Sequence, residues 1–281
     1  MSKELVIATC QFPVSRKVEE NLSYLLKLVA RAKDKGADVA HFSESSLSGY
    51  AGIDFMAFET QDQPLLMRSL AKIAELSARL KIWVIVGGHH FDAENEQPYN
   101  CLWIIDDRGV VVDRYDKRFC TGSPGRAEHF YYKPGRQPVQ CEIKGVTCGF
   151  LICHEWRYPE LYREQKRLGT DVLFQSWYDG NMSAAEYEDE GKEMGSLIRG
   201  TVRGRAANNY LWISASNTSK RASAFGSFVV QPDGRIRHQL KRNVTGMLIS
   251  RIALQSAFAD PSGPWRARAM EGVLHSDVLE T

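Results

Sequence analysis

Apolar residues along this chain alternate between short continuous runs and stretches with helical spacing. The continuous runs are rich in Val and Ile and predict strands buried on both faces, at residues 5–10, 38–42, 83–86, 139–143, 146–152, 172–174 and 211–215. Apolar residues recur at helical spacing over residues 22–32 and 64–80, and we expect further helices from about residue 159 and over residues 194–208. Strands and helices therefore follow one another along most of the chain.

Two segments depart from this alternation and predict β-hairpins. The apolar segments 102–105 and 110–115 flank the turn Asp106-Asp107-Arg108-Gly109, and a second turn lies at Pro232-Asp233-Gly234. Strands joined both by helices and by hairpins indicate a layered α/β fold with mixed sheets. No low-complexity linker divides the chain, so we expect one domain over residues 1–255 and an irregular tail over residues 256–281.

Composition narrows the class of partner. The 281 residues are 43% hydrophobic and 25% charged, which is enough to build a large core. The net charge of +2 is too balanced for a surface that binds nucleic acid or an anionic membrane. A small neutral or zwitterionic molecule is the partner that this composition favours.

The apolar run near the N-terminus is interrupted by Gln11 and Pro13, far short of the about 20 residues that span a bilayer. We therefore expect a cytoplasmic protein without membrane association. Its six cysteines contain no CxxC pair and predict reduced thiols rather than disulfides or a zinc cage. His89 and His90 end a predicted strand, but no matched acidic or cysteine partner accompanies them, so we expect a structural role and no metal site.

Cys153 is the candidate nucleophile. It lies at the end of a predicted buried strand, before a turn and a helix that begins near Pro159. Side chains at the carboxyl ends of strands in α/β sheets face the crevice in which such folds bind ligands. A single cysteine is more often a small core residue, which is the interpretation we give the other five.

Glu44 and Lys117 also follow predicted strands. A partly desolvated glutamate at the position of Glu44 has a raised pKa and can exchange a proton near neutral pH. The ammonium of Lys117 can lower a thiol pKa and stabilise an oxyanion. Taken singly, a glutamate such as Glu44 is more often a solvated loop charge, and a lysine such as Lys117 is more often an edge-strand charge that opposes aggregation.

Three aromatic residues, Tyr50, Trp156 and Trp177, follow these strands or motifs and are candidates for the apolar wall of a substrate pocket. Each fits a core position equally well.

Together these segments resemble the nitrilase superfamily of carbon-nitrogen hydrolases. The resemblance rests on Glu44 after the second strand, Lys117 after a hairpin strand, and Cys153 within GxxICHExxYPE, in the family's order. It extends from about residue 5 to about residue 252 and includes Ser48-Gly49-Tyr50 and the segment 205–217.

The resemblance implies a four-layer α-β-β-α sandwich with two mixed sheets. It also implies that Glu128 corresponds to the family's second glutamate, which holds the lysine and the substrate in place. Family members usually form homodimers or larger homo-oligomers, so the segment 256–281 is expected to contact a second copy.

The resemblance further implies hydrolysis of a small amide through a thioester on Cys153, with no cofactor. Glu44 would transfer protons, while Lys117 and the backbone N–H of His154 would hold the oxyanion. The His154 ring is not expected to act as the base, because neighbouring residues on a strand point to opposite faces.

The residues after the nucleophile favour one branch of the family. Nitrile-cleaving members usually carry Trp-Glu there, whereas this chain has His154-Glu155, with Arg157 four positions after Cys153, closer to amidases and carbamoylases. A nitrilase and an N-carbamoyl amino acid hydrolase remain as alternatives. A catalytically silent binding or scaffold protein of the same fold is the alternative outside enzymes.

Overall fold

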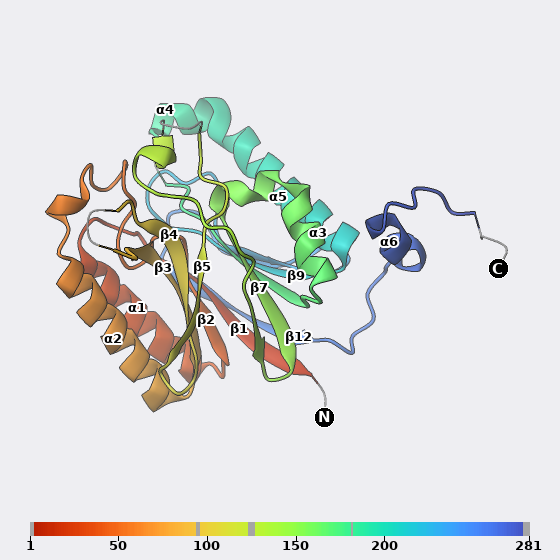
Figure 1. Cartoon of the computed structure of the whole chain (residues 1–281), viewed down its shortest axis with the longest axis horizontal. Helices are drawn as coiled ribbons and strands as arrows, with labels where there is room; N and C mark the ends of the chain where they lie inside the picture. The colour runs from red at the N-terminus through yellow and green to blue at the C-terminus, as the bar shows by residue number, and fades with distance from the viewer. Residues whose placement is uncertain (1–2, 94–95, 123–126, 181, 278–281) are drawn as a thin grey trace.

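Two six-stranded β-sheets lie face to face in the computed structural model, which describes residues 3–93, 96–122, 127–180 and 182–277. Helices cover the outer face of each sheet (Figure 1). This arrangement confirms the α-β-β-α sandwich with two mixed sheets that the sequence predicts.

The first sheet contains the N-terminal half of the chain and one strand from near its end. Its order is β12 (Gly246–Ala253), β1 (Glu4–Gln11), β2 (Val39–His41), β3 (Trp83–His90), β4 (Tyr99–Ile105) and β5 (Val111–Asp116). Strands β1, β2 and β3 are parallel, whereas β12, β4 and β5 run antiparallel to their neighbours. Strand β12 is not predicted from the sequence, because this edge strand is only partly buried and lacks a continuous apolar run.

The second sheet has the same number of strands. Its order is β11 (Ile236–Gln239), β10 (Phe228–Val230), β9 (Trp212–Ser216), β8 (Val172–Ser176), β7 (Val146–Ile152) and β6 (Gln140–Ile143). The central strands β7, β8 and β9 are parallel and buried, as their continuous apolar sequences predict. The predicted hairpin across residues 232–234 is the antiparallel pair β10–β11.

Four longer helices form the outer layers. Helices α1 (Val18–Asp34) and α2 (Gln63–Leu80) cover the first sheet, and α3 (Pro159–Arg167) and α5 (Lys192–Asn209) cover the second (Figure 1). Shorter helical segments are α4 (Ala184–Glu186), α6 (Gly263–Met270), η1 (Phe58–Thr60), η2 (Ala127–Phe130), η3 (Cys153–Arg157) and η4 (Tyr187–Gly191). Within the described ranges, none of these helices is both long and apolar enough to cross a membrane.

Helix α2 shows how local sequence sets these boundaries. The side chain of Asp62 caps the helix by accepting a hydrogen bond from the backbone N–H of Leu65 at 2.7 Å. Pro64 in the first turn cannot donate a helical hydrogen bond and is tolerated there. Leu66, Leu70 and other residues on the same face are buried against the first sheet.

Polar side chains join the two sheets at their centre. The hydroxyls of Thr9 on β1 and Ser214 on β9 lie 2.7 Å apart. The His41 ring on β2 lies 2.9 Å from the hydroxyls of both Ser214 and Ser176. Burial lowers the pKa of His41 to about 3, so the ring is neutral. These contacts fix the ends of β2 and β8 next to each other.

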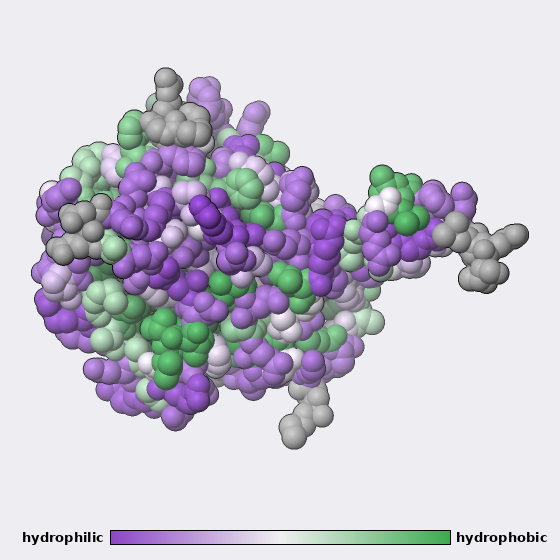
Figure 2. Space-filling model, in the orientation of Figure 1, coloured by the Kyte–Doolittle hydropathy of each residue, from purple (hydrophilic) through white to green (hydrophobic). Residues whose placement is uncertain are grey.

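Helix α6 is set apart from the two sheets and their covering helices (Figure 1). Arg266 anchors it by donating to the carbonyl of Asn208 at the end of α5, at 3.0 Å. Apolar residues are visible on its surface (Figure 2). Trp265 on the helix is 39% exposed, and Leu274, which follows the helix, is 84% exposed. The expectation of an irregular segment here is wrong over Gly263–Met270.

Candidate active site

The three residues proposed for catalysis each follow the carboxyl end of a strand. Glu44 lies just beyond β2, Lys117 directly follows β5, and Cys153 directly follows β7. The first two belong to one sheet and the third to the other, so the stacking of the sheets brings them to one end of the sandwich.

Lys117 lies between two carboxylates. Its Nζ donates to Glu44 Oε1 at 2.8 Å and to Glu128 Oε1 and Oε2 at 3.0 and 2.8 Å. All three side chains are buried. The structure thus joins Glu44, Lys117 and Glu128, which are up to 84 positions apart in the sequence, in one hydrogen-bonded group.

Further hydrogen bonds orient both carboxylates. Asn100 on β4 donates to Glu44 Oε1 at 2.7 Å and to Glu128 Oε1 at 2.8 Å. The backbone N–H of Tyr178 donates to Glu44 Oε2 at 2.9 Å, and that of Thr121 donates to Glu128 Oε2 at 2.6 Å. Asn100 is not predicted from the sequence, although its position two residues before a predicted hairpin strand is a signal that could have pointed to it.

Charge and burial set the protonation of this group. Burial lowers the pKa of Lys117, but Glu128 and Glu44 raise it by more, so the net pKa lies well above the ordinary value. Burial raises the pKa of Glu44. Burial also raises the pKa of Glu128, but Lys117 and the hydrogen bonds from Thr121 and Asn100 lower it by more. Lys117 is therefore a cation, and Glu44 holds a proton more readily than Glu128.

Cys153 is partly buried and begins the turn η3 rather than ending the strand. Its φ is 38°, an unusual value for a residue other than glycine. Burial raises the pKa of its thiol, Glu44 raises it further, and Lys117 and the backbone of Tyr178 lower it. The thiol therefore lies within electrostatic reach of Glu44 and Lys117.

Glu155 connects the turn that carries Cys153 to the loop that carries Lys117. This buried carboxylate accepts hydrogen bonds from the backbone N–H of Ile152 at 2.7 Å and of Arg118 at 2.7 Å. The hydroxyl of Tyr115 donates to it at 2.8 Å. Burial raises its pKa. Glu155 belongs to the cysteine motif, but the sequence alone does not predict this connecting role.

His154 lies in the turn η3 and not on a strand. Contrary to our expectation, strand geometry therefore gives no reason to exclude its ring. Its Nε2 lies 3.4 Å from the hydroxyl of Tyr158. Burial and Lys117 lower the pKa of the ring, which favours the neutral form.

The three predicted wall residues occupy different settings. Tyr50 is buried beside the catalytic group, with its ring centroid 6.0 Å from Lys117 Nζ and stacked on Tyr178 at 5.1 Å. Trp177 is buried against Phe225, and Trp156 is buried beneath the guanidinium of Arg157. Among these three residues, Tyr50 is the one whose ring lies beside a candidate catalytic side chain.

The histidines at the end of β3 have structural partners. His89 Nε2 lies 2.8 Å from the side-chain nitrogen and 3.1 Å from the side-chain oxygen of Gln63. Burial lowers the pKa of His89 to about 3. Among the residues that the structure describes, no three His, Cys, Asp or Glu side chains are grouped as metal ligands.

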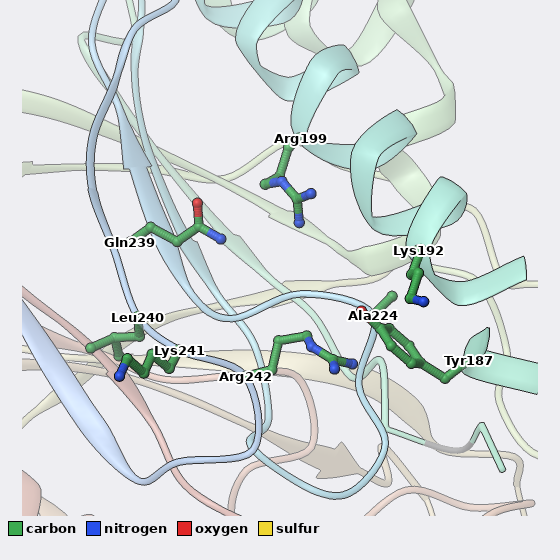
Figure 3. Close-up of a pocket in the computed structure, with 8 residues that line it drawn as sticks. All are labelled: Tyr187, Lys192, Arg199, Ala224, Gln239, Leu240, Lys241 and Arg242. Carbon is green, nitrogen blue, oxygen red and sulfur yellow. The ribbon is translucent and has the colours of Figure 1, made fainter. Parts of the chain in front are cut away.

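A separate surface pocket of about 600 Å³ lies between α5 and two loops of the second sheet. Four of its lining residues are cationic, and we call it the basic pocket: Lys192, Arg199, Lys241 and Arg242. Figure 3 shows Lys192 and Arg199 extending from α5 on one side and Arg242 beside the Tyr187 ring on the other. None of the candidate catalytic residues lines this pocket.

The chain is similar to known amidases in sequence and in fold. The chain is 25% identical to N-carbamoylputrescine amidase from Arabidopsis thaliana, over 90% of this chain and 87% of that protein. It is also 25% identical to deaminated glutathione amidase from Dictyostelium discoideum, over 90% of this chain and 89% of that protein. An amidase of the nitrilase superfamily from Nesterenkonia AN1 has the same fold, with a TM-score of 0.77 over 97% of this chain and 98% of that chain, at 19% identity.

The family model for carbon-nitrogen hydrolases matches residues 6–260. This match confirms the resemblance to the nitrilase superfamily. The chain therefore belongs to the carbon-nitrogen hydrolase family and is an enzyme that acts on carbon-nitrogen bonds other than peptide bonds.

Proposed function

We propose that this enzyme hydrolyses a small amide through a thioester on Cys153. The observation that carries the proposal is the ion pair at 2.8 Å between Lys117 and Glu44, which lies at the same end of the sandwich as Cys153. A nucleophile, a proton acceptor and a fixed cation are the groups that acyl transfer requires.

In the first half of the reaction, Glu44 accepts the thiol proton as the sulfur attacks the amide carbonyl. The raised pKa of Glu44 makes its carboxylate a better proton acceptor. Lys117 and the backbone N–H of His154 stabilise the negative oxygen of the tetrahedral intermediate. The carbon-nitrogen bond then breaks, and Glu44 returns the proton to the leaving ammonia or amine.

In the second half, Glu44 takes a proton from water as the water oxygen attacks the thioester. The carbon-sulfur bond breaks, the thiol regains its proton, and a carboxylic acid leaves. Glu128 acts on Lys117, because two of their atom pairs lie at 3.0 Å or less. Amide and water are thus converted to acid and ammonia, with the enzyme unchanged.

A carbamoyl compound is a second candidate substrate. The relative from Arabidopsis thaliana is named for N-carbamoylputrescine, and a carbamoyl group is itself an amide whose hydrolysis yields carbon dioxide and ammonia. Tyr50, Trp156 and Trp177 are the residues we propose for the substrate wall, with Tyr50 nearest the reacting groups. A nitrile remains the third candidate.

The test is ammonia release from matched small amides, N-carbamoyl compounds and nitriles, with wild type and Cys153→Ala. We expect release from an amide or carbamoyl compound, and a loss of about 10⁴-fold or more in Cys153→Ala, because the thioester cannot form. A Cys153→Ala enzyme with full activity would contradict the mechanism. An inactive wild type whose Cys153 reacts with iodoacetamide no faster than its other cysteines would favour the silent binding protein.

We also propose that residues 1–255 form the hydrolase domain and that residues 256–281 contact a second copy in a homodimer or larger homo-oligomer. The exposed Trp265 and Leu274 support this role, since exposed apolar groups on an extended segment favour a protein partner. A cytoplasmic location agrees with six cysteines that are all free. Sedimentation of the full chain and of a chain ending at Gln255 tests the assembly. If both chains assemble into the same number of copies, the contact role of residues 256–281 is contradicted.

A further inference from the structure

A second polar cluster surrounds the hydroxyl of Tyr178, outside the group of Glu44, Lys117 and Glu128. The hydroxyl donates to Asp54 Oδ2 at 2.8 Å and accepts from Lys220 Nζ at 3.0 Å. Lys220 also pairs with Asp54 Oδ1. Burial and the Asp54 carboxylate raise the pKa of the Tyr178 phenol, so the hydroxyl stays protonated and remains a donor. We call Asp54, Tyr178 and Lys220 the tyrosine clamp.

The clamp joins three loops at the carboxyl ends of the strands. Asp54 lies in the loop after β2, Tyr178 in the loop after β8 and Lys220 in the loop after β9. The side chain of Asp54 is 2% exposed and also accepts a hydrogen bond from the backbone N–H of Tyr50 at 2.9 Å. The side chain of Lys220 is 32% exposed, so the clamp lies between the interior and the solvent.

The backbone of Tyr178 contacts the catalytic group. Its N–H donates to Glu44 Oε2 at 2.9 Å and lowers the pKa of the Cys153 thiol. The last backbone donor before it, the N–H of Trp177, still bonds to Ser216 at the end of the neighbouring strand β9. Tyr178 is therefore the first residue after β8 whose backbone N–H donates to a candidate catalytic side chain and not to a neighbouring strand.

We propose that Asp54 and Lys220 are positioning residues for the hydrolysis, because they hold Tyr178 where its backbone N–H donates to Glu44. This inference rests on the proposed roles of Glu44 and Cys153. A hydrogen bond to a carboxylate favours its ionised form, so loss of the bond to Glu44 shifts the acid limb of the activity profile to higher pH. Misplacement of reacting groups by about 1 Å lowers turnover by up to about 10²-fold.

Stability alone does not account for the clamp. An ion pair taken out of water gains little net free energy, because the loss of hydration offsets the attraction. The loop also has an anchor of its own, since the backbone N–H of Asp179 donates to Asn217 Oδ1 at 3.0 Å. Lys220→Met leaves the buried Asp54 carboxylate without its cation and should lower stability, whereas Tyr178→Phe keeps the ion pair and should fold with the position of residue 178 changed.

The experiment compares Asp54→Asn, Lys220→Met and Tyr178→Phe with wild type. We measure kcat and KM for amide hydrolysis between pH 4 and pH 9, and the rate of Cys153 labelling by iodoacetamide over the same range. The expected result is a 10-fold to 100-fold lower kcat, a smaller change in KM and an acid limb at higher pH. Lys220→Arg, which keeps the cation, should restore most of the loss.

Two variants outside the clamp serve as matched controls. Tyr162→Phe removes a buried hydroxyl that donates to Gln175 at 2.6 Å, and Lys144→Met removes an Asp–Lys pair at 3.0 Å with Asp38. Both should keep the acid limb and the labelling profile of wild type. A shift of the same size in these controls would overturn the inference.

The outcomes separate this inference from the proposed function. Clamp variants whose acid limb and labelling profile match those of wild type would overturn the positioning role, even if their thermal stability falls. If wild type releases no ammonia from any substrate, the proposed function fails. The labelling profile of Cys153 then decides the inference: a changed pH dependence in the clamp variants supports it, and an unchanged one overturns it.

Discussion

Cationic side chains occur in two contrasting settings in this molecule. Lys117 is buried between Glu44 and Glu128, each at 2.8 Å. The basic pocket instead places four cations around about 600 Å³ of open space, and none of its lining residues is acidic (Figure 3). In the first setting the stability of the fold depends on the charge, because buried carboxylates surround it. In the second setting water can solvate the charges.

The energetic consequence follows from solvation. A buried charge that loses its partner costs about 3–5 kcal/mol, because nothing replaces the lost hydration. A cation at the surface stays hydrated, and its pairs contribute about 0–1 kcal/mol. Lys192, for example, pairs with Glu188 at 2.6 Å, but both side chains are more than half exposed. The same residue type should therefore give large effects in one setting and small effects in the other.

Lys117→Met should show the largest difference in stability between a buried cation and a cation of the basic pocket. It leaves Glu44 and Glu128 buried without a cation, so we expect about 3–5 kcal/mol lower stability and no measurable turnover. Arg199→Met, in the basic pocket, should change stability by no more than about 0.5 kcal/mol. Urea unfolding and ammonia release check both. Equal losses of stability in the two variants would refute the contrast.

The two carboxylates beside Lys117 should have different roles in catalysis. Glu44→Gln removes the proton acceptor and should abolish turnover. Glu128→Gln keeps the shape and the acceptor oxygen, so we expect a loss of about 10²-fold in kcat with Glu44 still in place. Steady-state kinetics on one amide measures both. If Glu128→Gln proved as inactive as Glu44→Gln, Glu128 would have to take part in proton transfer itself.

The sequence predicts the layers well because they depend on local pattern. The buried strands β7 and β8 are continuous apolar runs, and α2 has a cap, a proline in its first turn and an apolar face. The edge strand β12 escapes prediction, because its place is set by pairing with β1, which begins 242 positions earlier. Long-range pairing of a partly exposed strand leaves little trace in local sequence.

The site is predictable only in part for a similar reason. Glu44, Lys117 and Cys153 are recognisable because their motifs and order resemble a family. The backbone N–H of Tyr178 is not, since a backbone donor has no distinctive pattern, and the position of Asn100 before a hairpin strand is too weak a signal to identify it alone. Their roles arise only when β4 and β8 lie beside the loop that carries Glu44.

Asp179, which follows Tyr178 in the sequence, is a carboxylate that contacts a lining residue of the basic pocket. Its Oδ2 accepts from the backbone N–H of Ala224, a lining residue, at 2.7 Å. Burial raises the pKa of Asp179 from its ordinary 3.8 to about 6. Between these values the folded state binds more protons than the unfolded state, so this group makes stability fall as pH rises from about 4 to 6.

Asp179→Asn should remove that dependence. The amide oxygen can still accept from Ala224, but it carries no charge. We expect a gain on the order of 2 kcal/mol at pH 7 relative to wild type, and little gain at pH 4, where the folded carboxyl is protonated. Urea unfolding at the two pH values measures this. A gain of the same size at both pH values would show that packing, not ionisation, is responsible.

Arg242 is the basic-pocket cation that couples to a buried carboxylate, since it lowers the pKa of Asp179. It also lies 3.5 Å from the centre of the Tyr187 ring and donates to the carbonyl of Ser223 at 2.9 Å. Arg242→Met should therefore destabilise the fold in two parts. The lost contacts act at every pH, whereas the loss of charge acts only where Asp179 is ionised.

The second part can be isolated by its pH dependence. Without Arg242 the pKa of Asp179 rises further, so the destabilisation of Arg242→Met should grow as pH rises from 4 to 7.5. Lys241→Met, at a neighbouring lining residue, should show no such growth. Urea unfolding of both variants across this range measures how much the destabilisation grows with pH. This growth should be smaller than the stability changes expected for Lys117→Met and Asp179→Asn. If the destabilisation by Arg242→Met were constant with pH, the charge of Arg242 would not be coupled to Asp179, and Lys117 would differ from every cation of the basic pocket in acting on a buried carboxylate.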